Sequence, residues 1–131
     1  MKRTLIMAAA LLVLAGCGDA GGRAEAATTV ATRLLDAAAG HDGALACSYL
    51  APRTTSALEE QAGKPCPEAI LDEDLPAPGP VAGTSVYGQW AQVTLSTGTL
   101  FLGVFPSGWR VVAAGCTPDG DGPYDCTLQG S

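Results

Sequence analysis

The sequence predicts an α+β domain in which N-terminal helices pack on a curved antiparallel β-sheet. Residues 28–71 carry apolar side chains at helical spacing, whereas residues 81–114 form short β-branched and aromatic runs between turn residues. The two halves are separated by residues 72–80, which are acidic at first and then rich in proline. Because helices and strands are segregated along the chain, we expect a single sheet with its helices in a separate layer.

Each predicted helix is bounded by residues that are typical of helix ends. Asp42 and Pro52 stand where a helix starts, and Gly40 and Gly63 follow the positions where a helix ends. Between these boundaries the apolar residues form one stripe. The sequence therefore predicts helices over residues 28–39, 43–50 and 52–62, with a short turn over residues 67–71.

The sequence of residues 81–114 predicts three or four antiparallel strands, because its apolar runs are separated by turns that contain glycine and proline. These runs cover residues 81–87, 89–96, 99–105 and 109–114. In the second run Ala91, Val93 and Leu95 alternate with polar residues, so one face of that strand is buried and the other is solvated. A strand of this kind fits a sheet covered on one side.

The third run is apolar on both faces, since Leu100 and Leu102 alternate with Phe101. This pattern indicates either a central strand covered on both faces or a strand whose second face lines a pocket or an interface. The large aromatic residues of this half either fill the core or form that pocket or interface, and core is the default. They are Tyr87, Trp90, Phe101, Phe105 and Trp109.

The amino terminus has the parts of a bacterial signal peptide. Lys2 and Arg3 precede an apolar run over residues 5–16, which is shorter than the roughly 20 residues that a membrane-spanning helix needs. The run ends in Leu14-Ala15-Gly16-Cys17, which resembles the lipobox of bacterial lipoproteins. The alternative is an ordinary cleaved signal in which Cys17 is incidental.

The lipobox resemblance implies that Cys17 receives a diacylglycerol and becomes the amino terminus after cleavage. Two acyl chains hold a protein at a membrane durably, so the expected location is the outer face of the cell membrane. We therefore divide the chain into a signal peptide over residues 1–16, a flexible tether over residues 17–26 and one domain over residues 27–131.

The net negative charge of the chain limits the kinds of partner that it can bind. The chain has 7 basic and 13 acidic residues, and removal of Lys2 and Arg3 with the signal peptide leaves a net charge of −8. A protein with this negative charge repels nucleic acids and anionic lipid headgroups, so we do not expect it to bind either of them. The expected membrane contact is therefore the N-terminal diacylglyceryl cysteine alone.

Four cysteines remain once Cys17 is assigned to lipid: Cys47, Cys66, Cys116 and Cys126. An even number in an exported chain indicates two disulfides, and three pairings are available. We favour Cys47 with Cys66 and Cys116 with Cys126, because each pair flanks a local unit, and we expect residues 116–126 to be a closed loop. A metal site is the alternative, but the spacings are wide and there is a single histidine, so we expect no metal and no cofactor.

Four segments resemble small actinobacterial lipoproteins with an NTF2-like, cystatin-like domain. They are residues 37–44, 46–52, 108–116 and 123–126. The resemblance implies a cone in which a bent sheet wraps around helices and can leave a pocket between them. It does not imply an activity, because that fold hosts enzymes, ligand binders and adaptors.

No residue pattern points to catalysis. His41 lies in a glycine-flanked turn, which is typical of a solvated loop residue. The acidic clusters, residues 59–60, 72–74 and the alternating acids of residues 119–125, lack the spacing of a glycosidase pair or a calcium loop. We therefore expect no catalytic residue.

The leading functional expectation is a non-enzymatic binding or adaptor domain that meets an envelope protein or a small apolar ligand through its sheet face. The alternative is a pocket enzyme that uses an Asp or Glu as acid or base. An enzyme of that kind needs a buried carboxylate, whereas an adaptor needs an exposed apolar patch.

Overall fold

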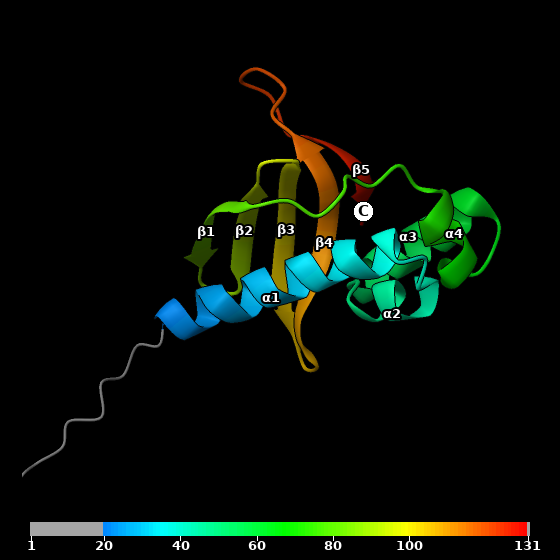
Figure 1. Cartoon of the computed structure of the whole chain (residues 1–131), viewed down its shortest axis with the longest axis horizontal. Coiled ribbons are helices and arrows are strands. Elements are labelled where there is room, and N and C mark those ends of the chain that lie inside the picture. The colour runs from blue at the N-terminus through cyan, green and yellow to red at the C-terminus, as the bar shows by residue number, and fades with distance from the viewer. Residues whose placement is uncertain (1–19, 131) are drawn as a thin grey trace, which may run out of the picture.

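The computed structural model describes residues 20–130, and it has the α+β architecture that the sequence predicts (Figure 1). The helices come first: α1 (Ala20–Ala39), α2 (Gly43–Ser48), α3 (Pro52–Ala62) and α4 (Cys66–Asp72). The strands follow: β1 (Val81–Tyr87), β2 (Trp90–Leu95), β3 (Gly98–Phe105), β4 (Gly108–Thr117) and β5 (Asp125–Gln129). Within residues 20–130, no helix has the length and apolar character needed to cross a membrane.

The five strands form one antiparallel sheet whose spatial order is the chain order, β1-β2-β3-β4-β5. The fifth strand was not predicted, and the expectation of a loop over residues 116–126 is wrong at both ends. Cys116 belongs to β4 and Cys126 to β5, and the two residues are partners in the strand register. Leu128 is the one large apolar residue of β5, which is too little for a strand pattern to show in the sequence.

The first helix begins at Ala20, so the flexible tether that we expected over residues 17–26 is wrong for residues 20–26. This segment is rich in alanine, which favours helix, and its Arg23 is held by the sheet. Arg23 Nη2 donates to the carbonyl oxygen of Gly88 at 2.5 Å, and its guanidinium lies 5.5 Å from the ring centroid of Trp109. The signal peptide, the lipobox and Cys17 lie outside the described residues.

One face of the sheet forms the core together with the helices. Figure 1 shows α1 running across this face, while α2, α3 and α4 gather beyond β4. Strand register places four of the core side chains in one row across β1 to β4: Val86, Ala91, Leu102 and Val111. Leu34 and Leu35 of α1 pack in the same buried cluster. The space between α1 and the sheet is thus filled by side chains.

The short helices are joined by the first disulfide, which is the predicted pair Cys47 and Cys66, with a Cα–Cα distance of 6.2 Å. Gly43 at the start of α2 lies so close to α4 that an added Cβ would stand 2.0 Å from the carbonyl oxygen of Pro67. Glu59 accepts the backbone N–H of Cys66 through Oε2 at 3.0 Å. The helices of this region are therefore fixed by close packing as well as by the disulfide.

Candidate ligand-binding site on the open face of the sheet

The sheet face turned away from α1 carries a row of exposed aromatic and arginine residues. Tyr87, Trp90, Gly103 and Arg110 are register partners across β1 to β4, and side chains of register partners lie on the same face. Tyr87 is 64% exposed and Trp90 is 56% exposed. No helix of residues 20–130 covers these two rings, and we call this side the open face.

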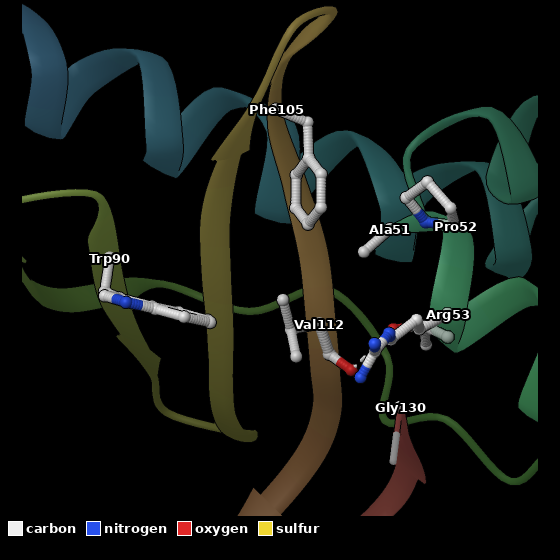
Figure 2. A pocket seen from close by; sticks show the side chains of 8 residues that line it. Ala51, Pro52, Arg53, Trp90, Phe105, Val112 and Gly130 are labelled. Atoms are coloured by element: carbon white, nitrogen blue, oxygen red, sulfur yellow. Dashed lines mark hydrogen bonds between the residues drawn. The ribbon is translucent and has the colours of Figure 1, made fainter.

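A pocket of about 420 Å³ lies on the open face beside the start of α3. Figure 2 shows Trp90 on one side, Phe105 and Val112 over the strands, and the first residues of α3 on the other side, with α1 behind the sheet. Its lining residues are Ala51, Pro52, Arg53, Thr54, Trp90, Phe105, Val112 and Gly130. A pocket of this volume is in the range that small ligands occupy.

Two features of the strands shape the floor of this pocket. Gly103 leaves room for both aromatic rings, because an added Cβ would stand 3.3 Å from Phe105 Cε2 and 3.4 Å from Trp90 Cζ3. The register of β3 with β4 shifts between Phe101 and Leu102, which leaves Val112 as an extra residue in β4. Such a bulge turns a side chain to a new direction, and here Val112 joins the pocket lining.

Hydrogen bonds between distant parts of the chain hold the α3 side of the pocket. The backbone N–H of Ala51 donates to Val111 O at 2.8 Å, and so fixes the start of α3 beside β4. The carbonyl oxygen of Val112 accepts from Thr54 Oγ1 at 2.9 Å and from the N–H of Gly130 at 3.0 Å. Thr54 is fully buried, so solvent does not compete for its hydrogen bond at this corner of the pocket.

A second pocket of about 260 Å³ adjoins the first and shares Val112 and Gly130 with it. Tyr124 covers this pocket from the loop between β4 and β5. Its ring meets Phe101 edge to face at 5.1 Å, and its hydroxyl oxygen accepts from Gln92 Nε2 at 3.4 Å. The predicted disulfide of Cys116 with Cys126 closes the base of that loop, with a Cα–Cα distance of 4.0 Å. The two pockets meet at Val112 and Gly130, and we call them together the depression.

The depression has a single charged residue in its lining, Arg53 of α3. Neither lining includes a carboxylate, a histidine or a free thiol. Across residues 21–130 every Asp and Glu side chain is exposed except Glu73, which is partly buried outside the depression. The chemistry offered to a ligand is therefore apolar contact, aromatic contact and one guanidinium.

The structure brings together four of the five aromatic residues that the sequence singled out. Trp90 and Phe105 line the first pocket, Phe101 lines the second, and Tyr87 lies beside Trp90 on the open face. Trp109 is not with them: it is only 8% exposed and belongs to the core cluster on the α1 side.

Sequence reasoning missed the residues that come from outside the aromatic runs. Arg53 lies in a polar helix turn that has no distinguishing pattern, and Gly130 lies beyond the last predicted strand. Tyr124 was part of the predicted loop, and only the fold of that loop brings it over Phe101. For Val112 the signal was the pair of adjacent valines at residues 111–112, which breaks strand alternation.

The remaining candidates from the sequence lie apart from the depression. His41 is exposed after α1, with a left-handed φ of 58°, and the acids Asp119, Asp121 and Asp125 are exposed in and beside the last loop. In the described part of the chain no group of three or more His, Cys, Asp or Glu side chains is arranged to hold a metal ion.

No family model matches the chain, and no match was found among curated proteins or solved structures. Function is therefore argued from the open face itself.

Proposed function

We propose that this protein is a non-enzymatic, lipid-anchored extracytoplasmic domain that binds a small apolar ligand on the open face of its sheet. The observation that carries the proposal is the 420 Å³ pocket between Trp90, Phe105 and the start of α3. Trp90 has more than half of its surface in water, and a ligand in this pocket would cover part of its apolar ring. The buried hydrogen bond of Thr54 with Val112 links α3 to β4 at the pocket, which favours a preformed site.

Two observations support the proposed location at the outer face of the membrane. The first is the lipobox at Cys17, and the second is the pair of disulfides, which form and persist in an oxidising compartment. The NTF2-like relationship also belongs to the proposal. It is supported by the order of helices and strands and by the two register shifts in the β3 and β4 pair, because bulges bend a sheet. The proposed site lies on the face opposite to α1, however, rather than between sheet and helices as in the cone.

The alternative of a pocket enzyme that uses a carboxylate as acid or base gains no support from the site. That chemistry needs a carboxyl group within hydrogen-bond reach of the substrate. The acidic residues of the described chain are exposed except for the partly buried Glu73, and none lines either pocket of the depression.

Binding is tested with octan-1-ol as a neutral apolar probe, using the full chain in phosphatidylcholine nanodiscs and saturation-transfer NMR, with empty nanodiscs as the blank. We expect octanol to bind the protein and Trp90→Ala to abolish binding, while Tyr87→Ala, outside the pocket lining, retains it. Circular dichroism verifies that both variants are folded. Binding that is absent, or equal in Trp90→Ala and the unchanged chain, would overturn the proposed site.

The anchor is tested by metabolic labelling with a fatty acid. We expect the unchanged chain to take up label and Cys17→Ser to take up none. Equal labelling of the two proteins would refute lipidation at Cys17.

A further inference from the structure

The distribution of positive charge around the depression differs from that of the protein as a whole. The chain has a net charge of −6, yet among the described residues Arg53 alone is charged in the lining of these two pockets. Arg110 lies on the same open face, since it is the register partner of Gly103 under the two aromatic rings. The pocket of an acidic protein therefore has one positive charge and no negative charge in its lining.

Within residues 21–130, Arg53 and Arg33 of α1 have neither a salt bridge nor a side-chain hydrogen bond, whereas the other three basic residues have partners. Arg23 is engaged by Gly88 and Trp109, Arg110 donates to the carbonyl of Trp109 at 2.8 Å, and Lys64 pairs with Asp72. Among residues 21–130 no salt bridge joins Arg53 to a carboxylate. Its guanidinium is therefore available to a ligand in the pocket.

A guanidinium beside an apolar pocket selects among ligands by charge. It binds a carboxylate or a phosphate oxygen with two parallel hydrogen bonds, contributes little to a neutral molecule and repels an ammonium group. Because no carboxylate lines the depression, an anionic ligand meets no repulsion there. The start of α3 beside Arg53 adds the positive end of a helix, and the N-cap Ala51 supplies no side-chain hydrogen bond to it.

We infer that the ligand is an amphipathic anion, an apolar body with one carboxylate-like group, whose apolar part lies against Trp90 and Phe105 while Arg53 binds its charge. This inference rests on the proposed function, because it names the class of ligand for the same pocket. Arg53 binds the carboxylate at the α3 side, and the apolar body extends over Val112 toward Trp90 on the opposite side of the pocket (Figure 2).

The test compares three probes that share one alkyl chain: octanoate, octan-1-ol and octylamine. Each is titrated at neutral pH and low salt into the full chain in phosphatidylcholine nanodiscs, with empty nanodiscs as the blank. We expect the Kd of octanoate to be about tenfold lower than that of octanol, which is the effect of one charge-assisted contact, and octylamine to bind most weakly. Equal Kd values for octanoate and octanol would overturn the inference.

A pair of arginine variants locates the effect. Arg53→Gln should raise the Kd of octanoate to that of octanol and leave the Kd of octanol unchanged. Arg33→Gln is the matched control, because it removes the same charge from α1 outside the depression, and it should leave all three Kd values unchanged. Loss of octanoate preference in both variants would show a general charge effect and would overturn the role of Arg53.

These outcomes separate the two proposals. If octanol and octanoate bind with equal Kd and Trp90→Ala abolishes both, the pocket stands and only the anionic class fails. If no probe binds, the proposed function fails together with the inference.

Discussion

The two faces of the sheet carry similar apolar side chains but meet different surroundings. On the α1 side Leu102 is fully buried, and Trp109 is 8% exposed beneath Arg23. On the open face Trp90 is 56% exposed, and Phe101 and Phe105 are half-buried. The covering helix, rather than the hydrophobicity of a residue, thus decides whether an apolar side chain serves stability or remains available for binding.

The comparison is tested most directly by the two tryptophans. Trp109→Ala should lower the free energy of unfolding by about 3–5 kcal/mol, because it opens a cavity in the core. Trp90→Ala should lower it by less than about 1 kcal/mol, since the ring is mostly in water. Urea unfolding followed by circular dichroism measures both, and equal losses would break the distinction between the faces.

The first disulfide tests how far the helical side depends on a covalent link. Replacing Cys47 and Cys66 together by alanine should lower the free energy of unfolding by about 3 kcal/mol, because the bond constrains the unfolded chain across a separation of 19 residues. Thermal unfolding of the variant measures this. A melting temperature equal to that of the unchanged chain would contradict this prediction.

A substitution of Arg23 tests whether its contacts with Gly88 and Trp109 hold the first turns of α1 against the sheet. Arg23→Ala removes the hydrogen bond to Gly88 and the contact with the Trp109 ring, and we expect a loss of about 1 kcal/mol. Hydrogen exchange should show faster exchange in the first turns of α1 and little change in α3. Unchanged exchange at residues 20–27 would show that this part of α1 does not depend on Arg23.

The smallest effect is expected at the exposed pair of Lys64 and Asp72. Hydrogen bonding and charge attraction from Asp72 raise the pKa of Lys64, so this contribution is present at neutral pH and is lost as pH rises through the raised pKa. The pair is open to solvent, which screens it. Lys64→Gln should leave the melting temperature at neutral pH unchanged within error, and a clear drop would contradict this.

Local signals account for what the sequence predicted well. Asp42 caps α2 by accepting the N–H of Leu45 at 3.1 Å, and Gly63 ends α3 with a left-handed φ of 67°. The two disulfides join the predicted pairs. Each of these features depends on residues close together in the chain.

The missed features depend on contacts between distant residues. The start of α1 is held by Arg23 and Gly88, which are 65 residues apart, and the pocket corner by Thr54 and Val112, which are 58 apart. From the sequence Trp90 and Trp109 look alike, and only the position of α1 shows which one is covered. The sequence could therefore single out the aromatic residues of the sheet, but it could not show which of them lie on the open face or that Arg53 joins them.

The order of the elements along the chain also separates the two disulfides into different parts of the domain. The four helices precede every strand in the chain. Their apolar sides therefore stay exposed until the sheet has formed. The Cys47 and Cys66 bond lies wholly within this early segment, whereas Cys116 and Cys126 meet only when the last strand is complete. The first bond therefore links α2 and α4 without any strand, whereas the pocket on the open face needs residues from both ends of the domain, α3 and Gly130.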